Sequence, residues 1–126
     1  MGVRVVSNDD NGVALEAPVT LNSNHLRTAF GGSINAVATL AAYGLLWLEL
    51  HDPAVHVVVA ESSIRFLRPV HSVIRAVCPH PRPDEWKAFQ TEFQSAGKAR
   101  IKLRVNVVEA GQTAAEFEGT FVARAS

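Results

Sequence analysis

A pair of glycines opens a long apolar run in this chain: residues 30–48 read FGGSINAVATLAAYGLLWL. The run predicts a helix that ends before Pro53, because proline cannot continue helical hydrogen bonding. Its longest apolar run, residues 36–48, would extend only about 20 Å as a helix, short of the roughly 30 Å of bilayer hydrocarbon. We therefore expect no membrane span, and instead a helix that its surroundings cover on nearly every side.

Strand patterns lie on both sides of this helix. Before it, residues 3–6 and 12–17 flank an Asn-Asp-Asp-Asn-Gly turn, which is typical of a hairpin. After it, apolar or alternating segments at 55–67, 73–78, 101–107 and 115–123 predict four strands. Between the second and third of these, a short helix is expected to be capped by Asp84 and ended by Gly97.

The register of the last hairpin follows from the polarity of its faces. A two-residue turn would set Arg104 against Phe117, whereas a three-residue loop at 110–112 keeps apolar residues opposite apolar ones. The longer loop pairs Arg104 with Glu118, Val105 with Phe117 and Ile101 with Phe121. We therefore predict the three-residue loop.

This order of elements predicts an α+β protein with the hotdog fold, in which a single antiparallel sheet wraps around one long apolar helix. An unrelated α+β sandwich is the alternative. The 126 residues are enough for one domain, 1–126. Twelve basic and twelve acidic residues cancel, which argues against a nucleic-acid partner. The single Cys78 excludes an internal disulfide and a multi-cysteine zinc site, and with no secretory signal visible we expect a cytoplasmic protein.

Four segments carry a resemblance to a known family. They are LNSNH at 21–25, TAFGGS at 28–33, IRFLRP at 64–69 and GKAR at 97–100. Together they resemble the hotdog thioesterases that, in some bacteria, form the C-terminal domain of a protein beginning with a GNAT-type acetyltransferase. The resemblance covers residues 17–123. More distantly, the chain is similar to the phenylacetate-pathway type of hotdog thioesterase.

The second resemblance implies positions for a catalytic site. That group has an asparagine, then His-Gly-Gly at the start of the central helix, then an acid on the helix. Aligning the glycines with Gly31 and Gly32 puts the asparagine at Asn24, the histidine at Phe30 and the acid at Thr39. The chain therefore keeps the asparagine and the glycines but lacks the histidine and the acid.

The glycine pair also has a physical case of its own. The first amides of a helix have no intrahelical partner and lie at its positive end, and glycine lets a ligand approach them closely. Gly31 and Gly32 are therefore expected to stabilise the oxyanion formed from a thioester carbonyl, unless they form only a turn. Asn24 is expected to bind that carbonyl or the attacking water, with a loop Asx-turn as its alternative.

Two further polar residues are candidates near this chemistry. Thr39 lies nearly two turns beyond Gly32, so its hydroxyl would either order water or bond back to a carbonyl one turn earlier. Glu61 interrupts an apolar strand and is a candidate base, contributed by a neighbouring subunit. Its alternative is a place at a polar dimer edge.

The remaining expectations concern the substrate. Phe30, Val37 and Leu40 are expected to line the acyl chain, and four cations are phosphate candidates: Arg65, Arg68, Lys98 and Arg100. We expect hydrolysis of an acyl-CoA or acyl-carrier-protein thioester by a homodimer, with tetramer formation left open. Coenzyme A enters only as part of the substrate, with no cofactor or metal. The alternatives are a non-catalytic acyl-CoA binding or sensing module, and a dehydratase or hydratase, which the lack of an evident His–carboxylate pair disfavours.

Overall fold

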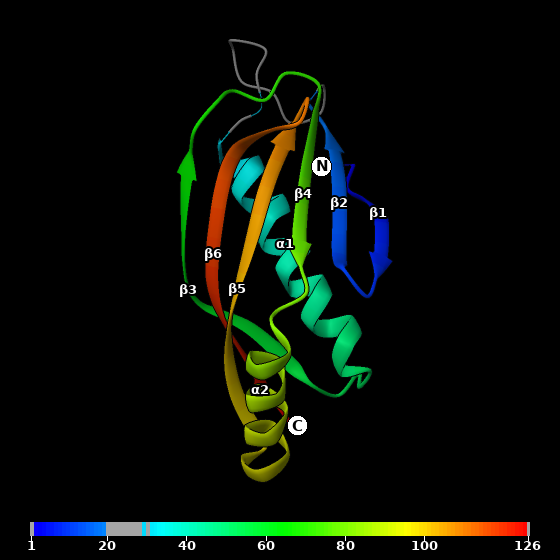
Figure 1. Ribbon diagram of the computed structural model, residues 1–126, viewed down its shortest axis with the longest axis vertical. Coiled ribbons are helices and arrows are strands. Elements are labelled where there is room, and N and C mark those ends of the chain that lie inside the picture. Colours follow the sequence, from blue (N-terminus) through cyan, green and yellow to red (C-terminus); the bar gives the residue numbers. More distant parts are fainter. Residues whose placement is uncertain (1, 20–28, 30, 126) are drawn as a thin grey trace.

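The computed structural model describes residues 2–19, 29 and 31–125, and Figure 1 shows its eight helices and strands. In chain order they are β1 (Arg4–Asp9), β2 (Gly12–Pro18), α1 (Gly31–Leu50), β3 (His56–Phe66), β4 (Val73–Pro79), α2 (Pro83–Ala96), β5 (Lys98–Glu109) and β6 (Gln112–Arg124). This is the element order that the sequence predicts.

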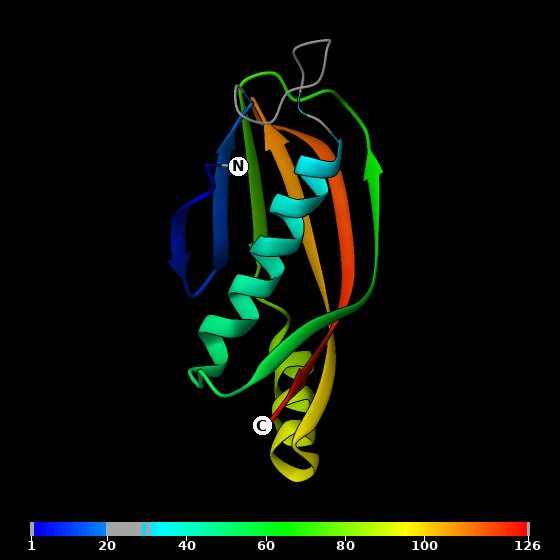
Figure 2. The same ribbon diagram turned by 180° about the vertical axis from the view of Figure 1, so that it is seen from behind.

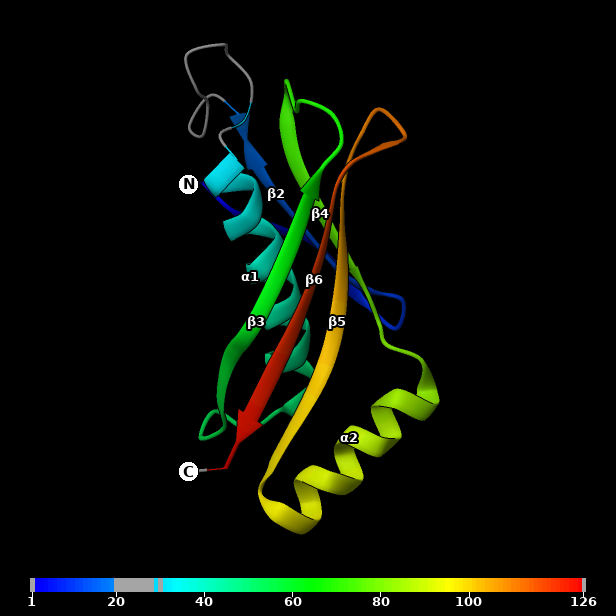
Figure 3. The same ribbon diagram turned by 90° about the vertical axis from the view of Figure 1, so that its left-hand side faces the viewer.

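All six strands form one antiparallel sheet in the order β1-β2-β4-β5-β6-β3. Figure 2 shows α1 lying across one face of this sheet, with its first turn at the end where β3 finishes. The second helix, α2, lies at the opposite end of the sheet, beside the first part of β5 (Figure 3). The predicted hotdog fold is confirmed.

The alternation along each strand separates an inner from an outer face. In β5, Ile101, Leu103 and Val105 are buried with the helix in the core, while the residues between them are exposed. Seven residues of α1 are buried in the same core: Ile34, Val37, Ala38, Ala41, Ala42, Leu45 and Leu46. By length and composition α1 could cross a membrane, but these contacts give it the role of a core helix.

On its far side, away from the sheet, α1 is partly exposed among the described residues. Leu40, Tyr43 and Trp47 are 43%, 38% and 42% exposed, and we call these three residues the α1 stripe. The expectation that the domain would cover its helix on nearly every side is therefore wrong. Exposed large apolar side chains gathered on one helix face are typical of an interaction surface.

The last hairpin has the predicted register for a different reason. Arg104 pairs with Glu118 and Val105 with Phe117, as expected, but Ala110 and Gly111 alone form the turn, both with positive φ. The one-residue shift comes from a bulge in β6 at Ala114, and not from a three-residue loop. The bulge carbonyl of Ala114 accepts hydrogen bonds from the amides of Leu67 and Arg68, which fixes the start of the β3–β4 loop.

The ends of α2 follow the prediction only in part. Gly97 ends the helix in the left-handed conformation, as expected. Its N-cap is Arg82, with no capping side-chain hydrogen bond, so the expected cap by Asp84 is wrong; Asp84 lies within the first turn instead. Pro83 begins the helix because its missing N–H is not needed there.

Candidate functional site

The first turn of α1 is the centre of the candidate site. Neither Gly31 nor Gly32 has a positive φ, so the pair begins the helix and is not a left-handed turn. No acidic side chain lies in this turn to neutralise the positive end of a 20-residue helix. The local field therefore favours a developing negative charge, as an oxyanion site requires.

The side chain of Phe66, at the end of β3, borders this turn. A Cβ built on Gly31 would come within 3.4 Å of Phe66 Cζ, so the ring lies next to the glycine backbone. Phe66 is also 53% exposed, so it borders the glycine backbone without being buried against it. Sequence reasoning assigned Phe66 no role, although an aromatic residue at a strand end just before Arg68-Pro69 was the available signal.

Two of the predicted site residues, Asn24 and Phe30, lie outside the described residues. Thr39 lies on α1, where its hydroxyl donates a 2.8 Å hydrogen bond to the carbonyl of Asn35. This is the backbone contact that threonine often makes in a helix, one turn back. The hydroxyl oxygen retains its lone pairs, so Thr39 can still accept a hydrogen bond from water but has no proton left to donate.

Glu61 lies on the outer face of the sheet. It pairs with Thr120 in the register of β3 and β6, after a bulge at Ala60, and lines a small outer hollow with Lys102 and Glu118. The first turn of α1 is on the inner face, so Glu61 does not approach Gly31 within a protomer. This position favours the alternative for Glu61, a polar residue at an edge strand, over a catalytic base.

The predicted acyl-chain residues divide between core and surface. Val37 is fully buried and packs in the core, so it lines no open site in the protomer. Leu40 is exposed and belongs to the α1 stripe. Tyr43 and Trp47, which sequence reasoning left unassigned, extend this apolar surface along the helix; their spacing of three and four residues was the signal.

The four predicted phosphate ligands lie in different places. Arg65 is bound to the carboxylate of Glu116 on the outer face, and that hydrogen bond raises the pKa of Arg65. Arg68 lines a hollow beside the β5–β6 turn and makes no ion pair in the part of the chain that is described. Lys98 and Arg100 line another hollow on the outer face, together with His56, Val58, Val122 and Arg124. We call these six residues the cation pocket.

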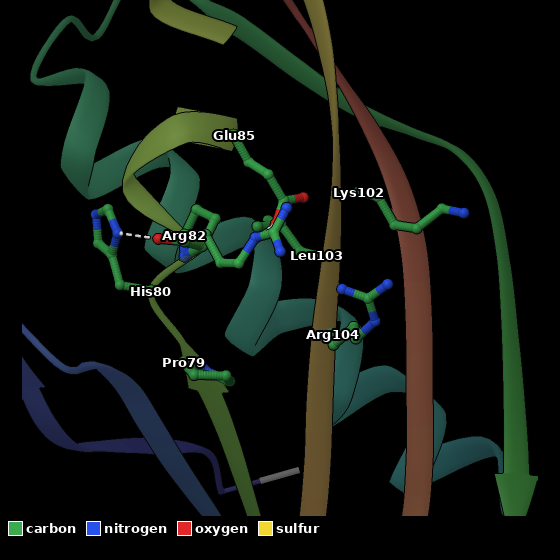
Figure 4. Close-up of a pocket in the computed structure, with 8 residues that line it drawn as sticks. Pro79, His80, Arg82, Glu85, Lys102, Leu103 and Arg104 are labelled. Atoms are coloured by element: carbon green, nitrogen blue, oxygen red, sulfur yellow. Dashed lines mark hydrogen bonds and ion pairs between the residues drawn. The ribbon is translucent and has the colours of Figure 1, made fainter. Parts of the chain in front are cut away.

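A separate hollow lies between the β4–α2 connection and β5 (Figure 4). Its charges are compensated: Arg82 binds Glu85 at 3.0 Å, while Lys102 extends away from it toward β6, where it binds Glu118 at 3.1 Å. Because each cation already has a carboxylate partner, this hollow should bind an anionic ligand more weakly than the cation pocket.

One His–carboxylate pair holds the loop beside the site. Glu109 accepts hydrogen bonds from the amides of His71 and Ser72 at 2.9 Å each, and the His71 ring lies 3.4 Å from the same carboxylate. The neighbouring carbonyl of Val70 in turn accepts the amide of Ala29, two residues before the first turn of α1. The expectation that no such pair is evident was wrong, but its geometry is that of a loop anchor.

The protonation of Glu109 reflects these contacts. Burial alone would raise the pKa of this carboxyl, but the hydrogen bonds from Ser72 and His71 outweigh burial and lower it. Burial also raises the pKa of the Cys78 thiol, and since burial is the cause of that shift, the pKa reaches about 12. Among residues 2–19, 29 and 31–125, no group of three or more histidine, cysteine or carboxylate side chains could hold a metal ion.

Comparisons with known proteins agree with this picture. A model of the family described as "Putative thioesterase (yiiD_Cterm)" matches residues 1–125. A solved structure of a protein with unknown function from Chlorobaculum tepidum TLS is 31% identical, with a TM-score of 0.92 over 100% of this chain and 84% of that one. A "putative thioesterase" from Shewanella oneidensis is 30% identical, with a TM-score of 0.86 over 98% and 85%. A "probable thioesterase" from Pseudomonas aeruginosa is 25% identical, with a TM-score of 0.83 over 99% and 84%.

Proposed function

The chain belongs to the thioesterase family whose model it matches, and from this membership we propose that it hydrolyses the thioester of an acyl-CoA or acyl-carrier protein. The observation that carries the proposal is the start of α1: two glycines, no acid in the first turn, and the ring of Phe66 at one side. This arrangement suits a carbonyl that becomes negatively charged.

In the proposed reaction, water adds to the thioester carbon and a thiol then leaves. The water oxygen bonds to the thioester carbon, and the carbonyl oxygen takes up negative charge, which the amides of Gly31 and Gly32 stabilise. The C–O double bond then re-forms, the C–S bond breaks, and the proton from water passes to the sulfur. The products are a carboxylic acid and a free thiol. Asn24, by resemblance, and Thr39, as an acceptor, order the water; we assign no general base.

The α1 stripe is the surface on which we place the acyl chain, because it is apolar, exposed and continuous with the helix that carries the glycines. This assignment keeps Leu40 from the sequence prediction and replaces Val37 with Tyr43 and Trp47.

A homodimer would complete the site through the edge strand β3. This strand has eleven residues, and within the described part of the chain it pairs on one side only, with β6; Val59 is 43% exposed on the edge next to α1. An unpaired edge of this length is prone to pairing with another strand. Antiparallel pairing of two β3 strands would cover both edges and bring the two α1 stripes together over one continuous sheet.

The decisive experiment is a hydrolysis assay that detects the released thiol, run with acyl-CoA substrates of increasing chain length and with acyl-carrier protein. Turnover that is lost in Asn24→Ala supports the proposed site. Turnover that is unchanged in Asn24→Ala would show that the chemistry lies elsewhere.

A second candidate function is a non-catalytic acyl-CoA sensor. The observation that favours it is Thr39, whose only proton is donated to Asn35 O and which stands where the related group has an acid. Tight binding without turnover, for every substrate tried, would establish the sensor and exclude the enzyme.

A further inference from the structure

The cation pocket lies at one end of the sheet and is formed by three neighbouring strands, β3, β6 and β5. His56, Arg124 and Lys98 form one cross-strand row, and Val58, Val122 and Arg100 form the next. The six side chains line a hollow of about 420 Å³ on the outer face. Figure 3 shows the first residues of β3 and β5 and the last residues of β6 meeting at this end.

The positive charges of the cation pocket are not compensated. Lys98, Arg100 and Arg124 form no ion pair within the described part of the chain, although Lys102 and Arg104, further along the same face of β5, both meet Glu118. The nearest carboxylate by register is Glu61, which lies in the following row beside Lys102. Three cations and a histidine therefore face a hollow with no acidic lining residue.

The floor of the cation pocket is apolar. Val58 is 57% exposed, and Val122 lies beside it in the register of β3 and β6. Cations around an apolar floor suit a ligand that combines several phosphate charges with a flat apolar ring. Arginine is well suited to such a ligand because its guanidinium binds phosphate oxygens in pairs.

The extent of the charge favours a compact anion over a nucleic-acid strand. The uncompensated cations end after two rows, since the third row carries Glu61 and the fourth carries Glu118. A strand of nucleic acid would need the basic surface to continue. The protein also has no net positive charge.

We propose that the cation pocket binds the phosphorylated adenosine end of coenzyme A and serves the active site of the partner subunit. This inference rests on the proposed function and adds the carrier and the subunit that recognises it. Coenzyme A fits because its adenosine carries a 3′-phosphate and a diphosphate. His56 and Arg124 join Lys98 and Arg100 as ligands, while Arg65 is excluded by its bond to Glu116.

The length of β3 indicates that the cation pocket serves the active site of the partner subunit and not that of its own protomer. Phe66, beside the first turn of α1, lies ten residues beyond His56, or about 33 Å along an extended strand. The cation pocket of a protomer is therefore at the wrong end for its own site. Antiparallel pairing of two β3 edges places the His56 end of one protomer beside the Phe66 end of the other. Because the pocket lies where the strands end, the pantetheine arm can pass around the ends of the strands from the outer face of the sheet to the inner face.

The first test compares substrates with and without the nucleotide. In Arg100→Gln/Arg124→Gln, the KM for acyl-CoA should rise about tenfold or more, as expected for lost charged contacts, while kcat and the KM for the acyl-pantetheine thioester stay unchanged. The matched control is Lys102→Gln/Arg104→Gln, which removes two compensated cations from the same strand face and should change neither constant. Equal losses on both substrates, or no loss on acyl-CoA, would overturn the proposal.

Adenosine 3′,5′-bisphosphate is the second probe. It should inhibit hydrolysis of acyl-CoA competitively, and its binding, measured by calorimetry, should be lost in the double variant. Binding without competition would identify a free-nucleotide site and overturn the substrate role. A loss confined to acyl-carrier-protein substrates would identify a protein-docking surface instead. Absence of turnover on every thioester is the failure of the proposed function, and calorimetry then still tests the nucleotide site.

The third test asks which subunit the cation pocket serves. Gly31→Asp, which should repel the oxyanion, is mixed with the double variant and allowed to exchange subunits. If the pocket acts across the dimer, each mixed dimer has one intact site, and random mixing restores about a quarter of the wild-type kcat/KM for acyl-CoA. If the pocket serves its own protomer, the mixture recovers nothing beyond the average of the two variants.

Discussion

The ring of Phe66 lies against the backbone of Gly31, with Phe66 Cζ 3.4 Å from the position a Cβ would take. This relationship joins the end of an edge strand to the first turn of the central helix. A methyl group at residue 31 fits in van der Waals contact with the ring, so the space at Gly31 is not required for folding. Under the proposed function, the missing side chain instead lets a substrate carbonyl approach the helix amides.

Gly31→Ala should therefore separate stability from activity. Alanine is the better helix former, so the melting temperature should stay the same or rise slightly. The added methyl would obstruct the approach of a carbonyl to the helix amides, so kcat/KM should fall about tenfold or more. Thermal unfolding and thiol release measure the two effects on the same protein.

A double variant identifies the cause of that loss. If Gly31→Ala acted only by displacing the ring, Gly31→Ala/Phe66→Ala would be as active as Phe66→Ala alone. We expect the double variant to be about tenfold or more less active than Phe66→Ala, because the methyl blocks the ligand itself. Full activity in Gly31→Ala would remove the first turn of α1 from the mechanism.

Val59→Lys should dissociate the proposed homodimer. Val59 is exposed on the β3 edge beside α1, and a charge there would be buried against its counterpart in the partner. Sedimentation should show a monomer, and hydrolysis should fall with the loss of the shared site. Val5→Lys is the matched control: it is 60% exposed on β1, at the other edge of the sheet, and should leave mass and activity unchanged. A wild-type monomer would refute the dimer outright.

Glu61→Gln should keep kcat within about twofold of the wild type, because this side chain lies on the outer face with Thr120 and Lys102 and not with Gly31. The pH profile of kcat should also be unchanged, since no catalytic proton is removed. A drop of a hundredfold or more, with a lost acidic limb, would restore Glu61 as the base.

The element order and the hairpin register could be predicted because they follow from periodicities within short segments. The alternation in β5 and β6 fixes which residues face α1. A three-residue loop, and a two-residue turn followed by the bulge at Ala114, both produce the same pairing of Arg104 with Glu118. For that reason the pairing was right and the loop was wrong. A bulge leaves no signature in alternation that distinguishes it from a longer loop.

The candidate site could be predicted only where one element carries it. Gly31, Gly32 and Thr39 share α1, so helical spacing relates them. Phe66 and the ion pairing of Arg65 depend on which strands become neighbours, and sequence alone does not supply this. Glu61 shows the limit most clearly, since the Ala60 bulge and the pairing with β6 decide its face.

Cys78 should not react with thiol reagents in the folded protein. It is fully buried, and burial raises its pKa to about 12, so at pH 8 only about one thiol in ten thousand is ionised. Labelling with a disulfide reagent should therefore occur only after unfolding in denaturant. This lack of reaction matters for the hydrolysis assay, whose signal is a released thiol. Rapid labelling of the native protein would contradict the burial of Cys78 in the sheet.

Glu109→Gln should change how stability depends on pH. The folded-state pKa of Glu109 lies below its ordinary value of 4.5, because hydrogen bonds from Ser72 and His71 outweigh the effect of burial. A lowered folded-state pKa means that the carboxylate stabilises the protein above about pH 4.5, and that this contribution is lost as pH falls through the folded-state value. The free energy of unfolding of the variant should therefore be about 1–3 kcal/mol lower than that of the wild type at pH 7. On acidification, this free energy should fall less in the variant than in the wild type.

Urea unfolding at pH 7 and at pH 3.5 measures this difference. Glu116→Gln is the control, since its ion pair with Arg65 is exposed and should contribute little to the free energy of unfolding at pH 7. Because the loop that Glu109 holds also binds Ala29 through Val70, we expect Glu109→Gln to lower kcat as well, whereas Glu116→Gln leaves kcat unchanged. If Glu109→Gln and the wild type lost equal stability on acidification, the carboxylate would not be the anchor of this loop.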